Sequence, residues 1–427
     1  MGLFAYILED KGGCHRVTGS TIDHLVSLMV FLGAILLFIG LFNQTIQTAI
    51  LYQRHRSIAT KCSDLLDNML LNPGVPLYWG KSNCTPTGFG LQDPEFKQYR
   101  LSPFSLMRLI SSSGEPVYYP RTGKYYSNIT MGWGNFLLVS FTESVNYSTV
   151  AGLLGINGSY GFQLTVTPLI TVSISKISVG TPLKLEIKVA GSGFPLINAP
   201  VSYCFLKIEK GDKQYPSFTV SSNTTYTGET GAALLTFSNV HGETDSYSLI
   251  AYAHFSGLIG VGYYNHVTTS LEEYIIPFVD SFEDRRVLLA HSWAVKDPGD
   301  KTSQSELKYN ATFVILAEDF TLREMPLGTG RVGHVVYGKG SEKDYGVVTI
   351  PTYNPGILIV TYKKSATEYG AVLMPWGISS MAFPVTFGDN PFGKEWVATD
   401  IRQVLVNNIA YQAKLALWSL QGYQVIG

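Results

Sequence analysis

This chain has little charge, few cysteines and few histidines, and each shortage narrows what the protein can do. Charged residues make up 15% of the 427 positions, and 31 Lys and Arg against 32 Asp and Glu leave a net charge of -1. A near-neutral chain without a basic stripe gives no electrostatic reason to expect nucleic acid as a partner. The eight histidines are scattered without a His-x-x-x-His pair, so a zinc site would need distant segments. We therefore predict no metal, no cofactor and no nucleic acid.

Catalytic motifs are also missing. Gly333 to Lys339 resembles a phosphate-binding loop, but Gly340 stands where Ser or Thr would hold magnesium, and a hairpin turn explains the segment better. The run Glu283 to Arg286 places two acidic residues beside two basic ones, which is typical of solvated ion pairs. We predict that the protein is not an enzyme.

The feature that stands out is a charge-free stretch near the front of the chain. It runs from Leu25 to Gln53, and its first part, Leu25 to Phe42, contains only apolar and small residues. As a helix the whole stretch would reach about 43 Å, more than a bilayer core requires. A signal peptide is the alternative, but signal cores have roughly 7 to 15 residues, and Asn43 to Thr45 do not form a small-residue cleavage site. We predict a retained transmembrane span at residues 25–45, with the lipid bilayer as partner.

The predicted helix is longer than the span. Ser20 to Asp23 form a capping pattern, with a hydroxyl and an acidic residue before the apolar run. An apolar stripe at three- and four-residue spacing then continues past the membrane. Its members are Ile46, Ile50, Ile58, Cys62, Leu65, Leu66 and Met69. Asn72-Pro73-Gly74 stops the pattern, so we predict one helix over residues 20–72.

Glycosylation sequons indicate which side of the membrane each part occupies. Basic residues are nearly balanced across the span and do not decide it. Of seven Asn-x-Ser/Thr triplets, six follow the span, as expected if that side is extracellular, and the seventh, at Asn43, lies too close to the lipid to be used. The six candidate glycosylation sites are Asn83, Asn128, Asn146, Asn157, Asn223 and Asn310. We predict a cytoplasmic segment at residues 1–19 and an extracellular C-terminal ectodomain at the cell membrane.

The four cysteines divide by position. Cys14 precedes the span, whereas Cys62 and Cys84 both follow it and are 22 residues apart. A disulfide between Cys62 and Cys84 would fix the helix to the next segment, and we predict this bridge. Cys204 lies in an apolar run and is expected to be a buried hydrophobic residue, although it could compete as a partner.

A resemblance to a known family covers residues 15–170, under half of the chain. It is carried by Leu65 to Gly80 with its Pro-Gly turn, Phe89-Gly90-Leu91, the short helix opened by Ser102-Pro103, and Leu153-Leu154-Gly155 before the strand Phe162 to Val166. These features resemble archaeal type IV pilin-like and pseudopilin-like membrane proteins. The resemblance implies a pilin-like α/β head at residues 73–168 and like subunits as partners of the helix.

The pilin resemblance also implies processing. Cleavage after Gly19 would free Ser20, and Asp23 would pair with that amine in a neighbouring subunit. Here the acidic residue follows the glycine by four positions instead of five, and no Lys or Arg adjoins Gly19. An uncut anchor, with Asp23 as a helix cap, is the alternative that we favour.

Beyond residue 168 the periodicity changes to strand. Leu183, Leu185, Ile187 and Val189 alternate with charged residues, as in a half-buried strand. The turn segments at Gly193 to Pro195 and Thr227 to Ala232 resemble those of Ig-like surface repeats, so we predict an Ig-like β-sandwich at residues 169–270. Residues 271–427 are predicted to form a β-rich C-terminal domain that ends in a hairpin around Asn407-Asn408. The expected fold class is mainly β with one long N-terminal α-helix.

These observations predict a single-pass, membrane-anchored cell-surface protein with a structural or adhesive role. Binding would lie in the outer β-rich part. The alternative is a membrane-anchored extracellular enzyme that acts on glycans or peptides through residues 271–427.

Overall fold

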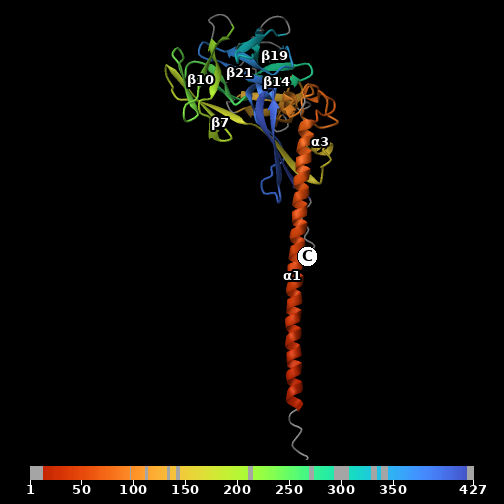
Figure 1. Cartoon of the computed structure of the whole chain (residues 1–427). Helices are drawn as coiled ribbons and strands as arrows, with labels where there is room; N and C mark the ends of the chain where they lie inside the picture. Colours follow the sequence, from red (N-terminus) through yellow and green to blue (C-terminus); the bar gives the residue numbers. More distant parts are fainter. Residues whose placement is uncertain are drawn as a thin grey trace, which may run out of the picture. The chain divides into compact units, whose positions relative to one another are not determined.

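The computed structural model describes residues 13–96, 98–110, 114–131, 135–140, 145–209, 215–268, 274–292, 307–327, 334–337 and 345–420. It confirms the predicted fold class, because strands predominate and one long helix stands at the N-terminal side (Figure 1). The chain divides into two compact units, Met1–Thr60 and Lys61–Gly427. We call them the N-terminal unit and the β-rich unit.

The long helix α1 runs from Gly13 to Leu71. Its predicted end is confirmed, but Ser20 lies inside the helix, so the predicted cap at Ser20 to Asp23 is wrong. A Gly-Ser pair lowers the stability of a helix by only about 1 kcal/mol. Such a pair therefore ends a helix only where the neighbouring residues also disfavour the helix. Beyond the helix, Gly74 has φ +80°, and a Cβ there would lie 2.8 Å from Gly88 O. The turn that follows α1 therefore requires glycine.

Within the β-rich unit, Lys61 to Leu71 of α1 lie against an antiparallel sheet with one parallel edge strand. The sheet order is β1 (Arg100–Leu101), β23 (Ala398–Val406), β24 (Ile409–Ser419), β5 (Tyr160–Pro168) and β22 (Val385–Gly388). Cys62, Leu66, Met69 and Leu70 are completely buried. The turn between β23 and β24 consists of Asn407 and Asn408, with φ 46° and 71°, which confirms the predicted hairpin.

Two further sheets combine distant parts of the chain. The first has the order β19 (Tyr345–Thr349), β15 (Arg286–His291), β14 (Ile275–Ser281), β4 (Asn135–Ser140), β3 (Lys124–Met131) and β2 (Glu115–Tyr119). The second has the order β17 (Leu322–Met325), β16 (Leu307–Leu316), β20 (Gly356–Lys363) and β21 (Tyr369–Trp376), with β18 (His334–Tyr337) also paired to β16.

Short helical segments join these sheets. They are η1 (Trp79–Lys81), α2 (Pro103–Ile110), α3 (Tyr147–Leu153) and η4 (Ile378–Met381). Asn146 caps α3 by accepting a hydrogen bond from Thr149 N at 2.8 Å.

Strand pairing cuts across the predicted division into residues 73–168 and 271–427. β5 of the first segment pairs with β22 and β24 of the second, and β4 pairs in parallel with β14. Figure 1 shows this mixing as strands of different colours in one part of the β-rich unit. Local periodicity identifies a strand but carries no information about a partner some 250 residues away, so the sequence suggested separate segments where the structure has shared sheets.

Residues 170–266 form a two-sheet sandwich. One sheet has the order β11 (Ala232–Phe237), β7 (Leu183–Gly191), β6 (Ile170–Lys176), with β8 (Phe194–Pro195) paired to β7. The other has the order β10 (Ser217–Tyr226), β9 (Pro200–Glu209), β12 (Tyr247–Phe255), β13 (Leu258–His266). Leu183, Leu185, Ile187 and Val189 are buried against β9 and β12, as their alternation predicted. The two strand orders correspond to the A-B-E and C′-C-F-G sheets of an Ig-like sandwich.

Candidate functional site

The anchor candidate lies in the N-terminal unit. From Ile22 the helix is long and apolar enough to cross a membrane, and none of its most apolar window is buried. Leu36, Leu37 and Phe38 are each about 70% exposed although they cover different faces of the helix. A helix that is apolar all round is suited to lipid on every side. By length and composition alone, an N-terminal signal sequence satisfies the same criteria.

Two hydroxyl groups of this stretch are satisfied within the helix. Thr45 Oγ1 donates to Leu41 O and Thr48 Oγ1 donates to Gln44 O, both at 2.8 Å. Such bonds let polar side chains enter a bilayer without water. Asp23 precedes the apolar stretch and is exposed, whereas the surroundings of Gly19 and of the Ser20 side chain are not described. The processing prediction therefore rests on sequence alone.

An ion-pair cluster joins the last turns of α1 to β23. Arg402 Nε lies 2.9 Å from Asp67 Oδ1, and its Nη1 lies 2.8 Å from Asp400 Oδ1. These carboxylates raise the pKa of Arg402. Partial burial opposes ionisation of Asp400, but hydrogen bonds from Ser63, Ile401 N and Arg402 outweigh it and lower the pKa of Asp400. The cluster fixes the helix against the sheet.

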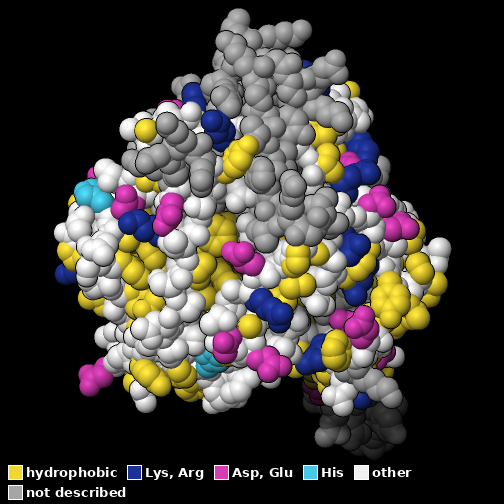
Figure 2. Space-filling model, turned by 90° about the horizontal axis from the view of Figure 1, so that it is seen from above, with side chains coloured by type: hydrophobic (Ala, Val, Ile, Leu, Met, Phe, Trp, Pro, Cys, Tyr) yellow, Lys and Arg dark blue, Asp and Glu magenta, His cyan; other side chains and the backbone are white. Residues whose placement is uncertain are grey.

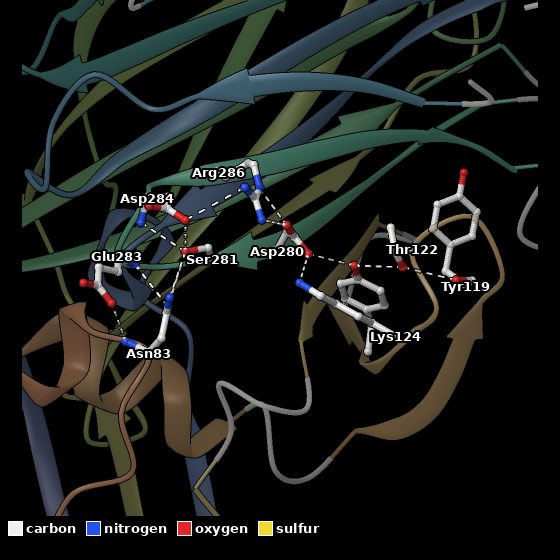
Figure 3. A network of polar contacts seen from close by, with 10 residues as sticks. Asn83, Tyr119, Thr122, Lys124, Asp280, Ser281, Glu283, Asp284 and Arg286 are labelled. Atoms are coloured by element: carbon white, nitrogen blue, oxygen red, sulfur yellow. Dashed lines mark hydrogen bonds and ion pairs between the residues drawn. The ribbon is translucent and has the colours of Figure 1, made fainter. Parts of the chain in front are cut away.

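A second polar network lies on the sheet that contains β3, β14 and β15 (Figure 3). Its centre is Asp280 on β14, which is only 5% exposed. Asp280 accepts hydrogen bonds from Lys124 Nζ at 2.8 Å, Tyr126 OH at 3.1 Å and Arg286 Nε at 2.6 Å. Burial opposes ionisation of Asp280, but the hydrogen bonds and charges of Lys124 and Arg286 prevail and lower its pKa. The carboxylate is therefore ionised and paired.

The network continues toward Asn83. Asn83 Nδ2 donates to Ser281 Oγ at 3.2 Å, and Ser281 Oγ accepts from Asp284 N at 3.0 Å. Figure 3 shows Asn83, Ser281, Asp284, Arg286 and Asp280 as one connected chain of contacts. The Glu283 to Arg286 run thus forms ion pairs and turn contacts, as its composition indicated.

Sequence reasoning missed both Asp280 and Arg108. Arg108 is completely buried in α2 and donates to Ser82 O at 3.1 Å and Cys84 O at 2.9 Å, and it also donates to Trp79 O. The one available signal was a single arginine in an otherwise apolar short helix, PFSLMRLI. Asp280 is likewise the one charged residue of an apolar strand, IIPFVDS, but its partner Lys124 is 156 residues away in the sequence.

The predicted disulfide is absent, since Cys62 and Cys84 are free thiols. Cys62 Sγ donates to Leu415 O at 3.5 Å, so its helix face meets β24. Burial raises the pKa of Cys62 to about 11. Cys84 is exposed, with Ser82 Oγ 2.9 Å from its sulfur. Spacing along the chain could not show which surface the Cys62 face contacts. Cys204 is buried, as expected.

The six sequons differ in accessibility. Asn146, Asn157 and Asn223 are exposed, and Asn83 is exposed but bonded to Ser281. Asn128 on β3 and Asn310 on β16 are half-buried, and the Oδ1 of each is buried without a hydrogen-bond partner in the described part of the chain.

No other chemistry gathers at one place in the residues that the structure describes. Among them, no group of three His, Cys, Asp or Glu side chains could hold a metal ion. The predicted hairpin at Gly333 to Lys339 lies partly outside the described residues, and its middle, His334–Tyr337, is strand β18. On the face drawn in Figure 2, acidic and basic side chains are intermingled, with hydrophobic ones between them.

Comparisons with known proteins add little. No protein-family model and no curated protein matches this chain. The solved D0-D1 domain of intimin covers 52% of this chain and 98% of its own length, at 16% identity and a TM-score of 0.20. The match to red sea bream transglutaminase covers 60% of this chain and 37% of the transglutaminase chain, at 10% identity and a TM-score of 0.19. Both TM-scores are too low to show a shared fold, so neither match indicates what this chain does.

Proposed function

We propose that this chain is a single-pass surface protein, with α1 as its membrane anchor and the β-rich unit as an extracellular, non-catalytic part for adhesion or assembly. The observation that carries the proposal is the charge-free stretch Leu25 to Gln53, whose Leu25 to Phe42 part is exposed on all sides. A helix with about 18 or more exposed apolar residues is unstable in water and stable in a bilayer.

The extracellular placement is supported by the sequons. All six candidates follow the span, and three of them, Asn146, Asn157 and Asn223, are exposed. The adhesive or structural role is supported by the Ig-like strand order at residues 170–266, since such sandwiches commonly serve as spacers or docking modules. As the pilin resemblance implies, we propose like subunits as further partners of the anchor helix.

The test compares the full chain with a variant that begins at Ile58. We expect the full chain to stay with membranes after an alkaline carbonate wash and to require detergent. The shortened variant should remain in the aqueous fraction, because contiguous apolar sequence of membrane length lies before Arg54. Full chain with an intact N-terminus in the aqueous fraction would contradict the anchor.

The same preparation tests orientation. A membrane-impermeant maleimide applied to intact cells should label Cys84, the exposed thiol after the span. A Cys84→Ser variant is the matched control. Labelling of Cys84 only after the cells are opened would place the β-rich unit inside and contradict the surface role.

A further inference from the structure

The loop between β22 and β23 presents an unusual apolar tip. Phe392 is 89% exposed, the highest value of any large hydrophobic side chain among the described residues, and Trp396 in the same loop is 48% exposed. Exposed apolar side chains that gather in one place, rather than singly, mark interaction sites in folded proteins. The question is which partner meets this tip.

The tip is held by its own backbone. Lys394 N donates to Pro391 O at 3.1 Å, and Gly393 lies at φ +74°, as a tight turn through Phe392 requires. Phe392 N donates to Asn390 Oδ1 at 2.9 Å. The turn holds Phe392 at the end of the loop, where its ring is exposed.

The loop lies at the end of the sheet where the chain from the anchor enters the β-rich unit. It leaves the sheet beside Phe162, whose O accepts from Asp389 N at 3.1 Å, and returns at Ala398, which pairs with Leu417. At that same end, Lys61 Nζ lies 4.4 Å from the ring centre of Tyr160. Lys61 is the first residue of the β-rich unit.

Leu420 adds to the apolar character of this end. It is 50% exposed, and its N donates to Ser159 O at 3.0 Å beside Tyr160. Glu229 lies in the β10–β11 turn, at the end of the sandwich that adjoins Leu169, the residue after β5. There Val189 N donates to Gly231 O at 2.9 Å and Ser192 N donates to Leu169 O at 3.5 Å, so Glu229 lies near the end of β5 opposite to Tyr160.

We propose that the loop Asp389 to Val397 contacts the surface of the bilayer and inserts Phe392 and Trp396 at the headgroup level. Lys61 follows residue 45, the end of the predicted span, by 16 positions, and 16 residues of helix rise about 24 Å. A segment of only this length tethers the end of the sheet at Lys61 to the lipid. Aromatic side chains concentrate at membrane interfaces because their rings suit the boundary between acyl chains and water.

This inference rests on the proposed anchor, and the experiment separates the two. The full chain is reconstituted in phosphatidylcholine vesicles whose lipids bear nitroxide groups near the headgroup. A fluorophore is attached in a Cys14→Ser, Cys84→Ser background at Lys394→Cys, which leaves both aromatic residues in place. Leu36→Cys reports on the anchor, and Glu229→Cys on the region beyond the end of β5 opposite to Tyr160.

We expect the nitroxides to remove about half or more of the emission at position 394, since interfacial aromatic residues lie at headgroup depth. Emission at position 229 should be unchanged. Replacing both Phe392 and Trp396 with Ser should restore most of the emission at position 394. Phe392 is 89% exposed, so the single variant Phe392→Ser should keep the fold and still reduce quenching at position 394, and an unchanged circular dichroism spectrum checks the fold of both variants.

Other outcomes overturn the inference in different ways. Quenching at position 36 without quenching at 394 would leave the anchor in place and refute the lipid contact of the loop. Equal quenching at 394 in the double Ser variant would refute the role of the aromatic residues. Emission that is unchanged at both 36 and 394 would refute the anchor and the inference together.

Discussion

Arg402 and Asp67, 335 residues apart in the sequence, form a two-pronged ion pair in the β-rich unit. The Nε–Oδ1 distance is 2.9 Å and the Nη2–Oδ2 distance is 3.1 Å. The planar guanidinium matches the two carboxylate oxygens, a geometry that lysine cannot reproduce. This pair secures the last turns of α1 to the C-terminal hairpin and leads to a first prediction.

Arg402→Ala should lower the free energy of unfolding of the β-rich unit by about 1 to 2 kcal/mol, because it breaks both contacts while partial exposure of the pair limits the loss. Arg402→Lys should cost less than Arg402→Ala. Thermal unfolding of the full chain in detergent measures both. Lys188→Ala is the control, since Lys188 pairs with Glu186 at 2.9 Å but its own side chain is exposed. An equal loss at Lys188 would contradict the special role of Arg402.

Asp280→Asn tests the buried network. Removing the charge leaves Lys124 and Arg286 without their shared carboxylate and should cost about 2 kcal/mol at pH 7. The native pKa of Asp280 is lowered, so its contribution is fully present above the unfolded-state pKa of about 3.9 and is lost as the pH falls through the native value. The gap between wild type and variant should therefore be constant from pH 7 to about 5 and close below about 4.

Thermal unfolding midpoints of the wild type and of Asp280→Asn, measured across this pH range, test the prediction. Glu229→Gln, at an exposed carboxylate, should leave the midpoint unchanged. A gap between wild type and Asp280→Asn that widens in acid would show that the charge is not stabilising.

The sequence predicted what is local in this fold. The alternation from Leu183 to Val189, the end of the helix before Pro73 and the Asn407-Asn408 turn each depend on neighbouring residues, and each is present. The predicted cap at Ser20 was wrong although capping is a local effect. A capping pattern stabilises a helix that starts at that residue, but it does not prevent the helix from starting earlier in the chain.

Contacts between distant segments could not be predicted in the same way. Asp280 meets Lys124 across 156 residues, and β24 meets β5 across about 250. Nothing in a single sequence marks such partners. The Cys62 and Cys84 bridge failed for this reason, since the prediction used their spacing while β24 occupies the Cys62 side of the helix.

Thiol labelling under native conditions should distinguish the three cysteines that follow the span. We expect N-ethylmaleimide to modify Cys84 rapidly, whereas Cys62 and Cys204 should react only after unfolding, because both are buried and burial raises both pKa values. Peptide mapping without reductant is the measurement. A Cys62–Cys84 disulfide in the native protein would contradict the structure.

Glycopeptide mapping of protein from its native membrane tests the sequons. Attached sugar is expected at Asn146, Asn157 or Asn223 and not at Asn128 or Asn310, where a glycan would have to displace neighbouring strands. Asn→Gln at each occupied position should remove the corresponding mass. Sugar on Asn310 in folded protein would contradict the burial of its side chain on β16.

The intact mass of the protein recovered from carbonate-washed native membranes tests the central claim most directly, because it shows whether the charge-free stretch is retained. The proposed anchor predicts a mature chain that begins before Gly19 and includes all of residues 20–53. Pilin-like cleavage would instead give a chain that begins at Ser20, with the anchor still present. A chain that begins beyond Thr45, or protein found only in the wash, would show that the stretch is a removed signal and would contradict the account.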